Sequence, residues 1–416
     1  MSNTSRKAST VFILVLLLLD SLGVGIVMPI VPRIFGSFLK DVRKTSDYYG
    51  LLLGLYPAIQ LVFAPILGGL SDRFGRRRVL LLSQLCTGLD YVFLAFAPSV
   101  FWFFVGRAIA GVAGSSFTAG AAYITDITPQ DRRAQAFGLM GATGATGMIL
   151  GAPLGGLLGG LDLRAPFFVA GGLALLNLCY GVFVLPESLR PELRRPFSSK
   201  RSNPLGAMKS LGRSPALLSL SGTATCGLMA QTISMSSLVL YEQERFGWSA
   251  FDVGVQLSTF GIAGAVVQGA AVRVAVEKLG ERRVVLWSLL ATTAGMVGVA
   301  LATHGWVVYA LVLPICLGGM AGPALQGLLT REVTASEQGE LQGALGMIQS
   351  IAWVLGPIVG TWLFGRFAPE SSIPHVPGAP FYAAALLAVA GFVLAARIFS
   401  RLPPRSPGAD QPTQDG

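Results

Sequence analysis

Residues 68–78 read Gly68-Gly-Leu-Ser-Asp72-Arg73-Phe-Gly75-Arg76-Arg77-Arg78, a charged stretch between two apolar segments. The glycines allow a tight turn and a close approach of helices, and basic residues favour the cytoplasmic face of a membrane. Asp72 is placed to meet a cation or the amino-terminal dipole of a helix. A plain basic loop would explain the arginines but not the Asp and the Gly spacing, so this stretch predicts a loop with a specific role.

Part of this stretch recurs in the second half of the chain. Gly75-Arg-Arg-Arg-Val-Leu-Leu returns as Gly280-Glu-Arg-Arg-Val-Val-Leu, 205 residues later. Pro153, in a Gly-rich segment, returns as Pro357 after 204 residues. Two independent signals with nearly the same offset indicate a parallel repeat of two similar halves.

The composition is that of a chain embedded in lipid. Of 416 residues, 52% are hydrophobic and 12% charged, against about 25% charged residues in soluble domains, and the mean hydropathy is +0.63. A bilayer core of about 30 Å needs roughly 20 apolar residues for each helical crossing. The segments long enough to cross are 10–32, 48–70, 79–97, 100–124, 135–159, 164–185, 214–240, 250–273, 284–303, 306–330, 341–365 and 380–400.

These segments predict an all-α membrane protein with twelve transmembrane helices in two six-helix bundles. We expect one bundle over residues 1–185, a cytoplasmic linker over 186–213, the second bundle over 214–402 and a disordered cytoplasmic tail over 403–416. Most Lys and Arg fall on the side that carries both termini, so both termini are expected in the cytoplasm. The basic residues are scattered among short connections, which argues against nucleic acid as a partner.

Other chemistry is not indicated. The four cysteines lie singly without metal-ligand spacing, and the sequence contains no HExxH, GxSxG or phosphate-binding loop. We therefore expect no enzymatic activity, no metal site and no cofactor.

Three charged residues interrupt the apolar spans. Asp20 lies in Leu16-Leu-Leu-Leu-Asp20, where a central Asp costs about 2.5–3.5 kcal/mol on insertion scales. Asp90 lies in the third span, and Arg107 is the one strongly basic residue well inside a span. A carboxyl group away from water favours its protonated form, and an approaching Arg favours the ionised form, as proton coupling requires. The alternative is a static Asp–Arg pair that fixes helix packing.

The fifth span contains Gly147-Met-Ile-Leu-Gly151-Ala-Pro153-Leu-Gly155-Gly156. Small residues and a proline predict a hinge at Gly151 and Pro153, and close helix packing is an equal alternative.

The stretch at 68–78 matches the signature GxLaDrxGrrxxl of the major facilitator superfamily, and the fifth span is similar to its antiporter motif gxxxGPxxGG. Leu19-Asp20-Ser-Leu-Gly-Val-Gly, Leu89-Asp90-Tyr91, Ile124-Thr-Asp126, Arg245-Phe-Gly-Trp248 and Pro323-Ala-Leu-Gln-Gly327 resemble the tetracycline/proton antiporters. The resemblance runs through most of the chain and implies the major facilitator fold, with a monomeric, multi-pass protein of the bacterial inner membrane.

The resemblance also implies roles for individual residues. Asp20 and Asp90, with Arg107, would handle protons. Asp126 would be the charge partner of the loop across the cytoplasmic face, and Gln60 and Gln268 would line the cavity. The residues assigned to gating are Gly68, Asp72, Arg73, Gly75, Arg76, Arg77 and Asp126. Gln231, Met235 and Phe260 are further candidates for a lipophilic cavity, although each has packing against lipid or helices as an alternative.

The second half departs from this family. Thr292 stands where the family has an intramembrane Asp, and Gly264 where it has a His. The sequence therefore predicts a proton-coupled exporter of a small drug-like compound such as tetracycline. A non-tetracycline multidrug exporter, a transporter of a sugar or siderophore, and a non-transporting receptor are the alternatives.

Overall fold

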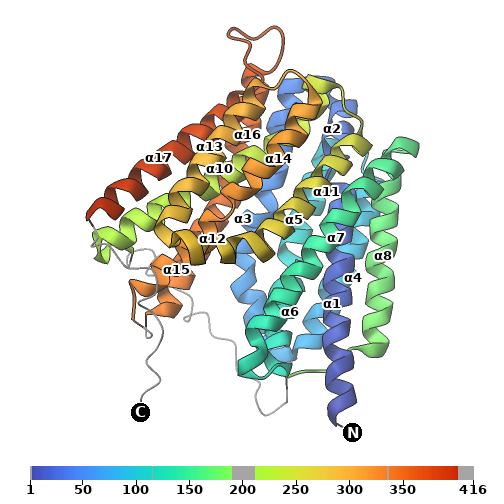
Figure 1. Ribbon diagram of the computed structural model, residues 1–416. Helices are drawn as coiled ribbons and strands as arrows, with labels where there is room; N and C mark the ends of the chain where they lie inside the picture. Colours follow the sequence, from blue (N-terminus) through green and yellow to red (C-terminus); the bar gives the residue numbers. More distant parts are fainter. Residues whose placement is uncertain (1, 115, 190–210, 335–336, 402–416) are drawn as a thin grey trace, which may run out of the picture. The chain divides into compact units, whose positions relative to one another are not determined.

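The computed structural model describes the chain except residues 1, 115, 190–210, 335–336 and 402–416. Every regular element in the described part is helical. Most of the expected linker and all of the expected tail lie outside the described residues. The all-α class predicted from the apolar segments is confirmed (Figure 1).

The first half of the chain builds eight helices within the described part. Asp41 caps α3, since its carboxylate accepts the backbone N–H of Lys44 at 2.8 Å. One short helix follows the first span, and another forms the end of the fourth span. The helices are α1 (Ser2–Val27), α2 (Val31–Leu39), α3 (Val42–Phe74), α4 (Arg76–Ala95), α5 (Val100–Ala113), α6 (Ser116–Ile127), α7 (Arg133–Leu161) and α8 (Ala165–Val184).

The second half repeats the pattern, with α12 leading into α13 through Gly280 as α3 leads into α4 through Gly75. Both glycines have positive φ, +78° and +100°, which a side chain would oppose. A π-helical turn, Val267–Ala271, joins α11 to α12. The helices are α10 (Pro215–Phe246), α11 (Ala250–Val266), α12 (Val272–Leu279), α13 (Glu281–Leu301), α14 (Gly305–Gly318), α15 (Ala321–Arg331), α16 (Gln338–Phe367) and α17 (Ala379–Arg401).

The twelve expected spans each coincide with one helix or one consecutive group of helices. Ten helices of the described part are long and apolar enough to cross a bilayer, and an eleventh is counted if the two parts of α3, bent by 48°, form one span. The fourth span is the exception, because its helix α5 ends at Ala113 after 14 residues and α6 continues it from Ser116. A glycine-rich sequence at the break gives the helix little side-chain support there.

Contacts divide the chain into two compact units that differ from the sequence repeat. The first unit comprises Met1–Ser202, Met235–Ile262 and Trp353–Pro380, and the second comprises the remaining segments. The first unit thus combines the first half with parts of α10, α11 and α16. Contacts show which segments lie close together, whereas the repeat shows which segments have similar sequences. The bundle boundaries inferred from the repeat therefore stay a prediction.

Glycines of α7 bring it against two helices of the first unit. A Cβ at Gly147, Gly151 or Gly155 would meet backbone atoms of α1 near Leu18, Leu22 and Ile26. On another face, Gly156 approaches Ala250 and Phe251, while Gly254 of α11 approaches Ala152 and Pro153. This packing accounts for the glycines of the fifth span, and the predicted hinge at Gly151 and Pro153 stays a prediction.

We expect Gly155→Ala to lower stability markedly, because its Cβ would overlap the carbonyl group of Ile26, which is backbone and cannot rotate away. Overpacking of this kind costs about 1–3 kcal/mol. Thermal unfolding in detergent measures the change. Gly160→Ala is the matched control, since no atom lies within 4 Å of a Cβ there. Equal melting temperatures for the two variants would contradict this account of the packing.

Candidate functional site

Asp20 lies in a buried polar network that crosses three helices of the first unit. Gln84 of α4 donates through Nε2 to Oδ1 of Asp20 at 3.3 Å. Asn177 of α8 donates to Oε1 of Gln84 at 3.5 Å and to the carbonyl oxygen of Leu16 at 3.3 Å. Gln84 and Asn177 are buried and Asp20 is half-buried, so the network holds one carboxyl oxygen of Asp20 in a defined place.

The sequence interpretation missed Gln84 and Asn177. Their signal is an amide inside an apolar run, Ser83-Gln84-Leu in the third span and Leu176-Asn177-Leu in the sixth. A polar side chain inside a membrane helix is energetically costly unless it hydrogen-bonds another polar group.

Asp90 of α4 is buried against α5, beside Gly106, which directly precedes Arg107. A Cβ added to Gly106 would clash with Oδ1 of Asp90, so the absence of a side chain there makes room for the carboxyl group. This oxygen has no hydrogen-bond partner among the described residues. The guanidinium carbon of Arg107 lies 5.9 Å from the ring centroid of Tyr91, in a cation–π arrangement. Asp90 and Arg107 therefore lie in one region of the first unit without the hydrogen bonds of a locked pair.

Arg76 connects the loop at residues 68–78 to α6. Its Nη2 lies 2.6 Å from Asp72 and its Nε 3.3 Å from Asp126, while Nη1 donates to the hydroxyl of Ser71. The planar guanidinium can hold two carboxylates at once, which a lysine ammonium does less well. The structure thus brings Asp72, Arg76 and Asp126 together.

A second carboxylate holds the same loop from the end of α8. Glu187 accepts the backbone N–H groups of Arg76 and Arg77 at 2.8 and 3.4 Å. It thereby caps the start of α4, where the N-cap residue Gly75 has no side chain that could do so. Ser188 donates to Asp126 at 3.0 Å. The sequence interpretation missed both residues, although Glu187-Ser188 directly follows the sixth span and its Pro186.

The remaining residues of the loop have smaller roles in the contacts. Arg77 donates to the carbonyl oxygens of Leu185 and Val182 at 2.6 and 2.7 Å. Arg73 is exposed and lies over the ring of Phe74, and the carbonyl oxygen of Gly68 accepts the hydroxyl of Ser71. Arg77 thus fastens the start of α4 to the end of α8.

The second half carries the same ion pair with its charges reversed. Glu281 follows Gly280 as Arg76 follows Gly75, and Arg331 of α15 lies 205 positions after Asp126 of α6. Nη2 of Arg331 lies 3.3 Å from Oε1 of Glu281. Each half therefore ties the start of its third span to the end of its fourth with one ion pair.

The predicted cavity residues are dispersed. Gln60 donates to the hydroxyl of Tyr56 at 2.9 Å and to the carbonyl oxygen of Gly114 at 2.6 Å, so its amide supports helix packing in the first unit. Gln268, in the second unit, donates to the carbonyl oxygen of Gly319 at 3.1 Å. Gln231 and Met235 are exposed on α10, and Phe260 is half-buried on α11. Their joint role in binding stays a prediction.

Thr292 and Gly264 differ in their surroundings. The hydroxyl of Thr292 donates to the carbonyl oxygen of Ser288 at 3.0 Å and packs against Gly318. Nothing lies within 4 Å of a Cβ at Gly264. At position 292 a hydrogen-bonded hydroxyl thus stands where the related antiporters have a charged carboxylate. At position 264 the space beside the glycine is open.

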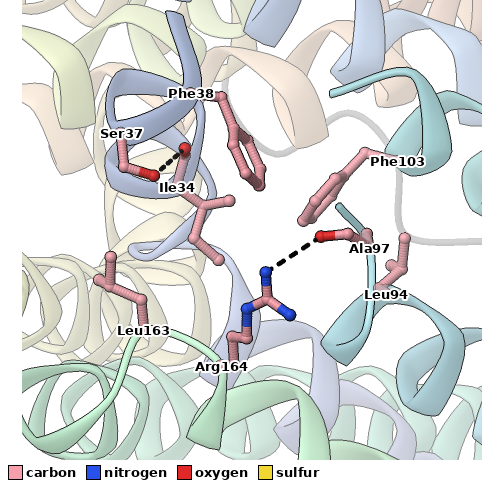
Figure 2. A pocket seen from close by; sticks show the side chains of 8 residues that line it. All are labelled: Ile34, Ser37, Phe38, Leu94, Ala97, Phe103, Leu163 and Arg164. Carbon is pink, nitrogen blue, oxygen red and sulfur yellow. Dashed lines mark hydrogen bonds between the residues drawn. The ribbon is translucent and has the colours of Figure 1, made fainter. Parts of the chain in front are cut away.

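A small cavity of about 70 Å³ lies in the first unit, lined in part by Leu94 near the end of α4 (Figure 2). Arg164 reaches into it and donates to the carbonyl oxygens of Ala95 and Ala97 at 3.1 and 3.3 Å. Pockets for drug-sized ligands have volumes of about 300–1,000 Å³. The cavity is too small for such a ligand, and none of the predicted site residues lines it.

The chain is similar to known proteins over most of its length. The family model of the Major Facilitator Superfamily matches residues 13–357 and 226–415. The class C tetracycline resistance protein of Escherichia coli is 36% identical over 89% of this chain and 93% of its own length. Multidrug resistance protein 2 of Bacillus subtilis (strain 168) is 30% identical over 88% of this chain and 91% of its own.

Solved structures show the same fold. A bacterial homologue of the human lysosomal transporter Spinster, in an inward-facing and occupied conformation, superposes with a TM-score of 0.76 at 16% identity, covering 96% of this chain and 99% of that one. The human organic anion transporter MFSD10 superposes with a TM-score of 0.67 at 21% identity, covering 94% and 99%. The chain belongs to the Major Facilitator Superfamily, among the relatives of the tetracycline resistance proteins, and is a multi-pass membrane transporter.

Proposed function

We propose that the chain is a proton-coupled antiporter that exports tetracycline. The observation that carries this proposal is the network around Asp20, because a half-buried carboxyl group held by one amide can exchange a proton without losing its position. Asp90 and Arg107 lie in the same unit and supply a second carboxyl group and a cation. The similarity over most of the chain to six tetracycline resistance proteins supports tetracycline as the substrate.

Arg76 and its partners serve as a gate in this proposal. An ion pair that links successive helices favours one arrangement of them, and its rupture lets the helices move. The Arg76–Asp126 pair and its counterpart Glu281–Arg331 stand at corresponding places in the two halves.

A bacterial inner membrane with both termini in the cytoplasm is the location we propose. The asymmetric distribution of Lys and Arg supports this orientation. The protein would act as a monomer, since a major facilitator chain contains both repeats that its central site needs.

The second candidate is export of other lipophilic drugs, and Thr292 favours it. A hydroxyl at this position offers a chelated tetracycline–metal ion complex one negative partner fewer than an aspartate would. The similarity to Multidrug resistance protein 2 supports the same reading.

Expression in a tetracycline-sensitive bacterium tests the proposal. Cells that produce the protein should accumulate less tetracycline than cells with an empty vector, and an uncoupler that collapses the proton gradient should abolish the difference. Unchanged tetracycline accumulation, together with lower accumulation of a lipophilic cation, would replace tetracycline with the second candidate.

A further inference from the structure

Glu242 is a fully buried carboxyl group that the proposed mechanism has not used. It lies one turn before the end of α10, with its side chain 0% exposed. Neither of its carboxyl oxygens has a hydrogen-bond partner among the described residues. An ionised carboxylate in such a place is strongly disfavoured, so the group must be neutral or must hold a ligand.

The charged side chains near this turn do not compensate Glu242. Gln243 donates to the carbonyl oxygen of Pro29 at 3.2 Å, which places the end of α10 against the junction of α1 and α2. The carboxylate of Asp252 is engaged by the backbone N–H and hydroxyl of Ser249. Glu244 and Arg245 follow Glu242 on α10, and neither of them hydrogen-bonds its carboxyl group.

Gln256 lies at a similar depth on the neighbouring helix. The turn at residues 247–249 joins α10 and α11. An α-helix rises about 1.5 Å per residue, so Glu242 lies about 6 Å along the axis from the end of α10 and Gln256 about 9 Å from the start of α11. Gln256 is 0% exposed, and neither atom of its amide has a partner. Gly254 and Ser258 contact α7, so Gln256, two residues from each, lies on the other side of α11.

A proton is the ligand that this environment admits. The site has no opening for a larger ligand, since both side chains are fully buried. A protonated carboxyl group is uncharged, so a fully buried place without a paired cation tolerates it far better than a carboxylate. The second half, which has Thr292 in place of an intramembrane Asp, thus retains a carboxyl group in another span.

We propose that Glu242 is a proton-binding site of the second half. Its carboxyl group is protonated while the end of α10 packs against the α1–α2 junction. When these segments separate, the O–H bond breaks, the proton passes to water and the carboxylate becomes hydrated. Proton loss at Glu242 therefore opposes closure of this contact. The inference rests on the proposed proton coupling, and it adds a residue outside the first-half network.

Infrared spectroscopy of the full-length protein in lipid tests the protonation directly. The carbonyl band of a protonated carboxylic acid should be present at neutral pH in the wild type and in Glu244→Gln, and diminished in Glu242→Gln. Glu244 is the matched control because it lies two residues away on the same helix and is exposed. An unchanged band in Glu242→Gln would overturn the proposal.

Transport by Glu242→Gln tests the coupling. Glutamine is neutral at every pH, so tetracycline accumulation driven by a pH gradient should fall to the level of protein-free vesicles, while tetracycline exchange at equal pH persists. Gradient-driven accumulation equal to that of the wild type would overturn the proposal. If the wild type moves no tetracycline, the proposed function fails, and the infrared band still decides the protonation of Glu242.

Discussion

Asp20→Asn should abolish proton movement coupled to tetracycline while leaving the protein folded in the membrane. The asparagine Oδ1 can still accept the hydrogen bond from Gln84, so the network with Asn177 survives. The amide cannot exchange a proton at any working pH, however, and loss of a positioned proton-transfer group costs about 10²–10⁴-fold in rate. Tetracycline-dependent proton flux into vesicles measures the loss.

Glu370→Gln is the control for this prediction, because Glu370 is an exposed carboxylate in the turn before α17. It should transport as the wild type does. Coupled flux in Asp20→Asn within about twofold of the wild type would exclude Asp20 as the proton carrier, since proton-transfer groups contribute far more than that. The coupling would then have to pass through Asp90 or Glu242.

Arg76→Gln should slow the transport cycle severely with little change in the affinity for tetracycline. The substitution removes the group that holds Asp72 and Asp126 together and leaves two carboxylates facing one another. The two carboxylates then repel one another, with partial screening by water because Asp72 is 44% and Asp126 23% exposed. Initial rates of tetracycline uptake into inverted vesicles, taken over a range of concentrations, separate the two effects.

Two variants sharpen this test. Arg76→Lys keeps the charge but not the planar fork, so it should recover only part of the rate. Arg78→Gln removes an exposed charge two residues away and should leave the rate unchanged. A rise in the tetracycline concentration for half-maximal uptake, with an unchanged maximal rate, would instead make Arg76 a binding residue.

Much of the fold was predictable because lipid imposes a simple rule. Each apolar segment must form a helix, and length and hydropathy suffice to find it. The repeat was visible at Gly75 and Gly280 because both positions need positive φ, which favours glycine. The break of the fourth span after Ala113 was not predicted, because an apolar run does not reveal where a helix is interrupted.

The site was less predictable than the fold. Asp20, Asp90 and Arg107 stood out as charges in apolar runs. Gln84, the partner of Asp20, and Asn177, the partner of Gln84, are neutral amides whose importance depends on which helices are neighbours. Glu242 escaped notice because it lies near a span end, among residues that read as a solvated turn. Only the packing of α10 in the first unit shows that its carboxyl group is buried.

The central claim is that tetracycline and protons move in opposite directions through this chain. The most direct measurement is the decay of an imposed pH gradient in vesicles that contain the purified wild-type protein, recorded before and after addition of tetracycline. The account predicts that tetracycline accelerates the decay in these vesicles and not in protein-free vesicles. An unchanged decay, in vesicles where the same protein transports tetracycline, would contradict proton antiport.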